Sequence, residues 1–386
     1  MSRILLRNCV LVDPEGPAEA PGSLLLEGDR IAARLSSESD TQPEDARIVD
    51  LAGARVAPGF LDLHHHGRAI FAANDAIVPR VRHDASELLR HGVTGFLVTS
   101  VAWPGPRLAE FVTSAAEAAS APPGDGATPL GLHLEGPWIR AEAAGAQPRG
   151  AVRAPQGAEV REILARGEGR IRMLTYAPEV DDAEMLQDEL LRHGVIGALG
   201  HTLARPLDAE RVMDRGARHV THLFNAMGAF HHRAPGLAGL ALADERLTCD
   251  LICDGVHVDP QVVRFTARSL GERLLLISDR VDPEPGADFG AGPLRDDGVA
   301  LRLEDGTLAG SRLTLESAAA NLAAFARVPA AEAVAAATLR PARLLGIESE
   351  RGTLRPGARA DLAVLDTQGR VTETWLGGRR VHPAPS

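Results

Sequence analysis

Hydrophobic and polar positions change their period repeatedly through the middle of the chain. Short apolar runs predict eight β-strands, at 56–63, 95–99, 130–134, 172–177, 195–199, 219–223, 247–253 and 273–278. Amphipathic stretches rich in Ala, Arg, Glu and Leu predict helices between them, at 85–91, 107–121, 158–165, 182–193, 208–215 and 260–269. This alternation predicts an α/β fold, a (β/α)8 TIM-type barrel, whose active site lies at the carboxyl ends of the strands.

Both ends of the chain have a different pattern, in which short alternating runs are separated by turn residues. Strands are expected at 3–12, 23–26, 30–33, 352–356, 361–365, 371–376 and 379–381, with loops at 14–22 and 36–46 and a turn at Gly377-Gly378. The ends therefore predict one small β-sandwich domain, formed by residues 1–55 and 351–386 around a barrel at 56–350. Residues 281–297, rich in Gly, Pro and Asp, predict a long loop after the eighth strand and a candidate lid.

Composition narrows the possible chemistry. The net charge of −11 argues against a nucleic-acid partner. All 41 basic residues are arginine, which excludes Schiff-base and pyridoxal-phosphate lysines, a P-loop lysine and a carbamylated-lysine metal bridge. Cys9, Cys249 and Cys253 have no zinc-site spacing and are expected to be reduced residues of a cytoplasmic protein. No signal-peptide pattern and no apolar run near 20 residues is found, so no membrane span is expected.

Two histidines follow the first predicted barrel strand, within the stretch PGFLDLHHHG. Because side chains alternate along a strand, His64 and His66 point to the same face, while His65 points to the other. The two imidazoles start about 7 Å apart along the strand and can converge on one ion where the strand ends. Such a pair also occurs by chance on solvated loops, so the residues that follow carry the interpretation.

Polar residues stand at the carboxyl ends of five further predicted strands: Glu135, His201, His257 and Asp279 follow their strands, and His222 lies at the end of the strand at 219–223. Barrel geometry collects all of them with His64 and His66 around one mouth. A lone histidine is usually a surface or core residue, but agreement at six strand ends predicts a metal site. Imidazoles and carboxylates suit zinc, and also iron, manganese or cobalt. Such a metal makes hydroxide available near neutral pH, and a further carboxylate can take and return protons.

At these residues the chain resembles the metal-dependent amidohydrolase superfamily, and within it the family of N-acetylglucosamine-6-phosphate deacetylases. The shared motifs lie between about residues 50 and 366 and are PGFLDLHHHG, HLEGP, GHT, THLFNAM, HHR with PGL, DGVHV and TLAGS. The THLFNAM string goes well beyond the spacing of a generic metal site.

The resemblance implies a role for each matching residue. Glu135, His201 and His222 hold the main divalent metal, and His64 and His66 hold a second one that some members lack. Asp279 is the general base that activates water and then protonates the leaving amine. The substrate lies against Ala146, Gln147, Asn225, Ala226, His257, Leu308, Ala309 and Gly310, and Arg233 binds its phosphate, a role that the planar guanidinium suits. The resemblance also implies a homodimer, in which residues near Arg233 lie close to the partner's site, and one or two metal ions per subunit, for which the types of ligand favour zinc.

The sequence departs from the family pattern at three places near the substrate. Gln147 stands where a histidine that contacts the acetamide is common, and a Gln amide can donate to a carbonyl but carries no charge. Arg280 follows the catalytic aspartate, where a small residue is usual, so it favours the ionised aspartate, binds an anionic group or turns outward. The segment 281–297 also differs.

These observations lead to one hypothesis with three alternatives. The hypothesis is hydrolysis of the N-acetyl group of a phosphorylated amino sugar, N-acetylglucosamine 6-phosphate, to glucosamine 6-phosphate and acetate, with Gln147 helping to polarise the carbonyl. The alternatives are N-acetylgalactosamine 6-phosphate or an N-acyl amino acid as the substrate, and a non-catalytic barrel that serves as a scaffold.

Overall fold

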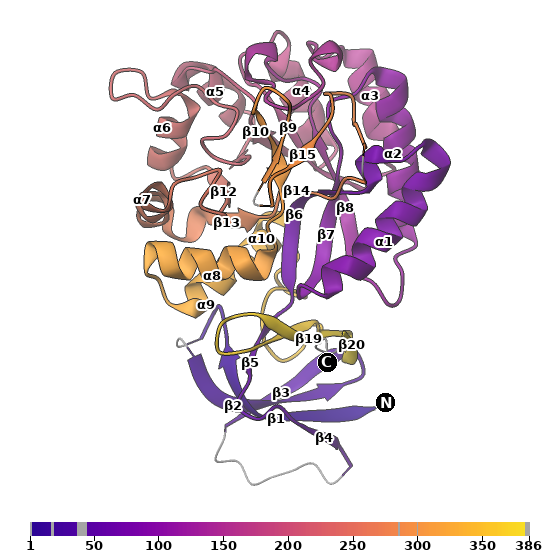
Figure 1. Cartoon of the computed structure of the whole chain (residues 1–386), viewed down its shortest axis with the longest axis vertical. Helices are drawn as coiled ribbons and strands as arrows, with labels where there is room; N and C mark the ends of the chain where they lie inside the picture. The colour runs from indigo at the N-terminus through magenta and orange to yellow at the C-terminus, as the bar shows by residue number, and fades with distance from the viewer. Residues whose placement is uncertain (1, 17–18, 37–44, 285, 299, 383–386) are drawn as a thin grey trace.

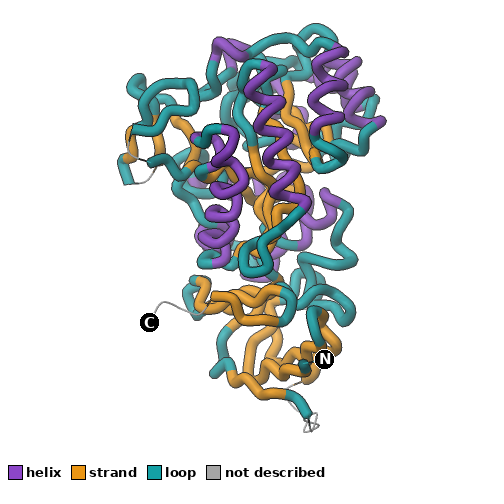
Figure 2. Tube along the Cα trace, turned by 90° about the vertical axis from the view of Figure 1, so that its right-hand side faces the viewer, coloured by secondary structure: helices purple, strands orange, loops and turns teal. Residues whose placement is uncertain are grey.

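The computed structural model describes residues 2–16, 19–36, 45–284, 286–298 and 300–382. Figure 1 shows a larger part, in which helices surround a set of strands, above a smaller part made of strands. Both chain termini lie at the smaller part, as the side view in Figure 2 also shows. The chain thus leaves the smaller part, forms the larger one and returns.

The larger part is a TIM-type barrel of parallel strands, as predicted. These strands follow one another in chain order around the sheet: β6 (Phe60–Gly67), β7 (Val93–Thr99), β8 (Thr128–Glu135), β9 (Ile171–Tyr176), β10 (Ile196–Leu199), β11 (His219–Val220), β12 (Thr248–Ile252) and β13 (Leu274–Ile277). Beyond the end of β13, the N–H of Asp279 donates to the carbonyl of His64 on β6 over 2.9 Å. This contact brings the first and last barrel strands together.

Helices cover the outside of the barrel, and most of them bury one apolar face. They are α1 (Ile77–Leu89), α2 (Gly105–Ser120), α3 (Gly157–Arg166), α4 (Ala183–Arg192), α5 (Pro206–Met213), α6 (Gly236–Ala243), α7 (Pro260–Leu270), α8 (Leu315–Ala326), α9 (Ala330–Ala336) and α10 (Leu339–Leu345). On α1, for example, Ile77, Val81, Ala85 and Leu88 recur at helical spacing and are buried. The six predicted helices are present. The sequence does not predict α6, α8 and α9, because nearly uniform runs of Ala and Leu give no polar face to mark a period. It does not predict α10 either, whose seven residues include Pro341.

The smaller part is the predicted β domain formed by both ends of the chain. Its sheet has the order β20-β19-β18-β5-β1-β2-β3, with β4 on β1. These strands are β1 (Arg3–Val12), β2 (Glu19–Glu27), β3 (Arg30–Ser36), β4 (Arg47–Asp50), β5 (Arg55–Pro58), β18 (Leu362–Leu365), β19 (Val371–Leu376) and β20 (Arg379–His382). Its core contains Leu6, Ile31 and Trp375, which are buried completely. The turn at Gly377-Gly378 is present.

The run 56–63 is two strands rather than one. Pro58 at the end of β5 pairs with Leu362 of the small sheet, whereas Phe60 at the start of β6 pairs with Val93 of the barrel. Gly59 lies at the crossing, where a Cβ atom would come within 2.2 Å of the Thr94 side chain. The histidines consequently lie inside β6 and not after it.

Three further predictions about the ends and the lid need correction. Residues 352–356 form no strand, because Gly352 has a φ of +79° and turns the chain. The loop expected at 14–22 is shorter, since β2 begins at Glu19, and the loop expected at 36–46 falls mostly on residues 37–44, outside the described part. The 281–297 segment includes strand residues: β14 (Arg280–Val281) pairs with β6, and β15 (Arg295–Asp296) pairs with β16 (Ala300–Arg302), which pairs with β17 (Leu308–Ser311).

Among the described residues, no helix is both long enough and apolar enough to cross a membrane.

Candidate metal centre

The predicted ligands lie at the carboxyl ends of the barrel strands. His64 and His66 lie near the carboxyl end of β6, and Glu135 is the final residue of β8. His201, His222 and Asp279 each follow a strand and have positive φ angles of 48°, 34° and 48°. Non-glycine residues rarely adopt this left-handed conformation, and such backbone strain is concentrated at functional sites. The barrel thus holds the backbone of these three residues in a conformation that the local chain alone disfavours.

Six side chains form two adjoining groups that could each hold a metal ion, Glu135 with His201 and His222, and Asp279 with His64 and His66. Within each group one ligand atom per residue lies within 4.8 Å of the others, and all six residues are buried. The Nε2 atoms of His64 and His66 are 3.1 Å apart, so the two imidazoles converge as the alternation along the strand predicts.

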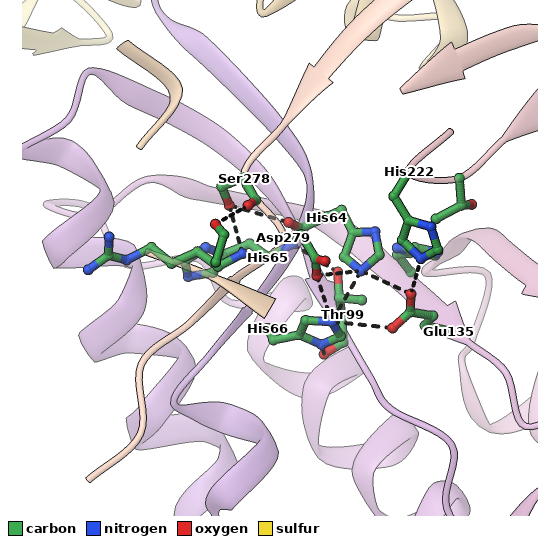
Figure 3. A network of polar contacts seen from close by, with 12 residues as sticks. His64, His65, His66, Thr99, Glu135, His222, Ser278 and Asp279 are labelled. Carbon is green, nitrogen blue, oxygen red and sulfur yellow. Dashed lines mark hydrogen bonds and ion pairs between the residues drawn. The ribbon is translucent and has the colours of Figure 1, made fainter. Parts of the chain in front are cut away.

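The carboxylate of Glu135 lies between the two groups, as Figure 3 shows. Its Oε1 is 3.0 Å from Nε2 of His201 and 2.9 Å from Nε2 of His222. Its Oε2 is 3.3 Å from Nε2 of His66, which in turn is 3.3 Å from Oδ1 of Asp279. Oε1 also lies 3.5 Å from Nε2 of His64, so the carboxylate of Glu135 contacts imidazoles of both groups.

Two of the imidazoles are oriented by backbone carbonyls. Nδ1 of His201 lies 3.0 Å from the oxygen of Ala143, and Nδ1 of His66 lies 3.3 Å from the oxygen of Thr99. Because a carbonyl only accepts, each Nδ1 carries the hydrogen and each Nε2 directs a lone pair toward the cluster. This arrangement of an imidazole between a carbonyl and a shared centre is typical of metal-ligating histidines.

Electrostatics also fits a cation at the cluster. Burial opposes the ionisation of Glu135, but the imidazoles of His64 and His201 hold the pKa of its carboxyl well below the usual range. Burial alone would lower the pKa of His66, yet hydrogen bonds to Asp279 and Glu135 raise it to about 10, so these carboxylates hold a proton on its Nε2 where no other cation takes the place of that proton. The donor set combines imidazole nitrogens with carboxylate oxygens, which matches zinc and other borderline divalent metals.

A cavity of about 250 Å³ opens beside the cluster and collects most of the predicted substrate residues. Its lining includes His66, Glu135, His201, His222 and Asp279, together with Ala146, Gln147, Asn225, Ala226, His257, Leu308, Ala309 and Gly310. Nδ1 of His257 is held 2.6 Å from a carboxylate oxygen of Asp254. Leu308, Ala309 and Gly310 belong to β17, which the sequence pattern does not predict as a strand.

Arg233 is the predicted substrate residue that the described lining of this cavity does not include. Its side chain is exposed, and its guanidinium lies 2.8 Å from Nε2 of His232. A single copy of the chain therefore brings no arginine to the cavity from this position.

The structure distinguishes between the interpretations of Arg280. Its guanidinium donates to both carboxylate oxygens of Asp282 and to the carbonyl of Arg312, and so it turns away from Asp279. It lines a second cavity of about 160 Å³ on the other face of β6, where His65 also points. The outward interpretation of Arg280 agrees with this geometry.

Gln147 is engaged at both ends of its side-chain amide. Oε1 accepts from the backbone N–H of Ala102 over 2.7 Å, and Nε2 donates to Oε2 of Glu135. The amide thus contacts a ligand residue as well as the cavity.

Sequence reasoning missed residues that support the ligands from behind. The carboxylate of Asp62 accepts from the hydroxyl of Ser278 over 2.6 Å and from the backbone N–H groups of His64 and Ser278, which joins the strand ends that carry His64 and Asp279. Asp250 on β12 accepts the backbone N–H of His222. A carboxylate inside an apolar strand is costly to bury, and this signal in the run 56–63 could have identified Asp62.

Comparison with known proteins shows that the chain is similar to amidohydrolases and, among them, to deacetylases of amino-sugar phosphates. Residues 55–381 match the amidohydrolase family. The chain is 32% identical over 396 aligned residues to N-acetylglucosamine-6-phosphate deacetylase of Bos taurus, across 98% of this chain and 95% of the relative. It is 30% identical to N-acetylgalactosamine-6-phosphate deacetylase of Escherichia coli O157:H7, across 88% of this chain and 90% of the relative. The structure of N-acetyl-D-glucosamine-6-phosphate deacetylase from Mycobacterium smegmatis, in complex with N-acetyl-D-glucosamine-6-phosphate, has a TM-score of 0.89 and 32% identity, across 99% of this chain and all of that one.

Proposed function

The chain belongs to the amidohydrolase family, and we propose from this premise that it hydrolyses the N-acetyl group of N-acetylglucosamine 6-phosphate to give glucosamine 6-phosphate and acetate. The observation that carries the proposal is the buried cluster around Glu135, in which two groups of metal-ligand type adjoin a cavity lined by Asn225, His257 and the β17 segment. An acyl-transfer site needs a centre that polarises a carbonyl, a group that moves protons and a cavity beside both.

We propose that Glu135, His201 and His222 hold the main divalent ion and that His64, His66 and Asp279 offer a second site. When bound, such an ion acts as a Lewis acid on a carbonyl and lowers the pKa of water. Zinc is the proposed native metal, because four of the six ligands are imidazoles; iron, manganese and cobalt are the alternatives.

Asp279 is the proposed general base. Its carboxylate lines the cavity, with its side chain 13% exposed, and its Oδ1 lies 3.3 Å from Nε2 of both His64 and His66. Burial opposes ionisation, but these imidazoles hold the pKa of Asp279 below its ordinary value, so the carboxylate is ready to accept a proton. It takes the proton of the attacking water and then donates it to the nitrogen of the leaving amine.

We propose that a second copy of the chain supplies the phosphate-binding arginine. The described lining of the cavity holds no arginine, whereas Arg233 is exposed and free to reach a neighbouring subunit. A homodimer in the cytoplasm would place the Arg233 fork of one protomer against the phosphate in the other, and a planar guanidinium suits bidentate contact with phosphate. If Arg233 has this role, Arg233→Ala raises KM for a phosphorylated sugar and not for its unphosphorylated form.

N-acetylgalactosamine 6-phosphate is the second candidate substrate, because the E. coli relative with that named activity covers 88% of this chain. The two sugars differ in the configuration of one hydroxyl, which the residues that line the cavity must distinguish.

The test is acetate release from both sugar phosphates, with and without added zinc, by wild-type protein and Asp279→Asn. Metal-dependent turnover that is lost in the variant supports the proposal, and the ratio of kcat/KM values identifies the preferred sugar. Absence of turnover on either sugar, in protein that carries its metal, would contradict the proposed substrate class and direct the search to N-acyl amino acids.

A further inference from the structure

The side-chain amide of Gln147 has only one possible orientation in this fold. Its Oε1 lies 2.7 Å from the backbone nitrogen of Ala102, and a backbone N–H can only donate. The atom opposite Ala102 must therefore be the oxygen, and the amide nitrogen must face Glu135. The usual ambiguity between the oxygen and nitrogen of a glutamine amide does not arise here.

The loop that carries Gln147 is itself fixed close to the site. The N–H of Gln147 donates to the carbonyl of Ala144 over 2.9 Å, and the residue is only 7% exposed. The same loop supplies the Ala143 carbonyl, which lies 3.0 Å from Nδ1 of His201. One loop thus orients two ligands of the same group, His201 through its backbone and Glu135 through Gln147.

The contact with Gln147 determines how the Glu135 carboxylate is rotated. The terminal torsion of a glutamate is broad, so a carboxylate without a donor can rotate and exchange its oxygens. Nε2 of Gln147 donates to Oε2, which also lies 3.3 Å from Nε2 of His66. Oε1 faces His201 and His222 at 3.0 and 2.9 Å and His64 at 3.5 Å, so Gln147 is the donor from outside the imidazole cluster that favours this rotation. Because an amide neither gains nor loses a proton in the working pH range, the donor persists at any such pH.

We propose that Gln147 is a positioning residue, which fixes the rotation of the Glu135 carboxylate so that Oε1 is presented to a metal held with His201 and His222. This inference rests on the proposed function only in requiring that the site bind a divalent ion. It replaces the interpretation of Gln147 as a group that mainly polarises the substrate carbonyl.

Metal affinity, measured by competition with a chromogenic chelator for Zn²⁺, tests this role. Gln147→Met keeps the length of the side chain and removes the donor, and we expect its affinity for zinc to fall about 10- to 100-fold, the usual effect of losing an outer partner of a ligand. Gln147→His keeps an acceptor for Ala102 and a donor for Glu135 on one ring, so we expect affinity close to wild type. The matched control is Gln187→Met, because Gln187 is also a buried glutamine but bonds to Tyr176, away from the cluster.

The possible results distinguish a failure of the positioning role from a failure of the proposed function. Zinc affinity of Gln147→Met equal to that of wild type, or an equal loss in Gln147→Met and Gln147→His, would overturn the positioning role. A raised KM with unchanged zinc affinity would also overturn it, since this is the result expected of a substrate contact. A wild-type protein that binds no zinc would overturn the proposed function itself. If Gln147→Met does not fold, as its circular dichroism would report, Gln147→Leu, which also lacks the donor to Glu135, is measured in its place: a 10-fold loss of zinc affinity relative to Gln147→His supports the role, and equal affinity contradicts it.

Discussion

Nε2 of His222 lies 2.9 Å from Oε1 of Glu135, although the two residues are 87 positions apart in the chain. Glu135 ends β8, whereas His222 follows β11, and two strands of the barrel, β9 and β10, lie between the strands that carry them. The contact is possible because parallel barrel strands present their carboxyl ends at one rim. A buried carboxylate at the centre of imidazoles makes this rim the place where a divalent cation is expected to bind.

Replacing the shared carboxylate tests the metal site directly. Glu135→Gln keeps the shape of the side chain and removes the charge that faces His201, His222 and His66. We expect zinc affinity to fall by more than about 100-fold, beyond the effect of losing an outer partner. Metal content after dialysis, determined by atomic emission, is the measurement. The exposed Glu142→Gln serves as the control, and a Glu135→Gln protein that retains its zinc would contradict the assignment of Glu135 as a ligand.

Replacing Asp279 should affect proton transfer more than substrate binding. Asp279→Asn removes the group that accepts a proton, and we expect kcat to fall on the order of 10²- to 10⁴-fold, the usual contribution of a general base. The zinc held by Glu135, His201 and His222 should remain, since Asp279 belongs to the other group. Steady-state kinetics and metal content on the same preparation check both statements. Activity within 10-fold of wild type would assign proton transfer to another residue.

Asp84 provides a pH dependence of stability that is separate from the ligands. It lies on α1, is buried, and accepts the backbone N–H of Arg68 with both carboxylate oxygens at 3.0 and 3.2 Å. Burial raises the pKa of Asp84 from 3.8 to about 8. The folded protein therefore holds this proton more tightly than the unfolded chain, so the contribution of Asp84 to stability is greatest below about pH 4 and is lost as the pH rises toward 8.

Asp84→Asn cannot ionise and should lack this contribution to the pH dependence. We expect the Tm of the variant, relative to wild type, to rise between pH 5 and pH 9. Thermal denaturation followed by circular dichroism at several pH values is the measurement. The exposed Asp125→Asn should keep a constant difference from wild type over the same range. A Tm difference for Asp84→Asn that is also constant would show that Asp84 is ionised in the folded protein.

Trp375 is expected to hold the small β domain together. Its side chain is completely buried on β19 in the core that contains Leu6 and Ile31, and its indole N–H donates to Glu373 over 3.0 Å. Trp375→Ala should lower the free energy of unfolding by about 3 to 5 kcal/mol, the typical cost of truncating a large buried aromatic side chain. Urea denaturation is the measurement, with Ile48→Ala as the control because Ile48 is 42% exposed. A loss below about 1 kcal/mol would mean that the core repacks around the cavity.

The positions of the candidate ligands could be predicted because they depend on local features of the chain. His64 and His66 are placed on one face by the period of a strand, and a polar residue after an apolar strand can be recognised without knowing its neighbours. Their convergence at 3.1 Å follows from this alternation and from the barrel that the repeated strand and helix signals predict. The patterns of α8 and α9 are nearly all apolar and so give no helical period, and the run 56–63 predicts a single strand because both of its halves are apolar.

The sequence by itself determined which candidate ligands lie at the barrel mouth. The alternation of side chains along a strand and the order of the strands can both be read from the chain alone. The tertiary structure decided what those side chains and their neighbours contact. Gln147 turns its oxygen to Ala102, 45 positions away, and Arg280 turns outward to Asp282 and to the carbonyl of Arg312, 32 positions away. Arg233 stays outside the described lining of the cavity. The contacts of Gln147 with Ala102 and of Arg280 with Arg312 depend on partners that the folded barrel brings together, and no local pattern specifies a partner that is distant in the chain.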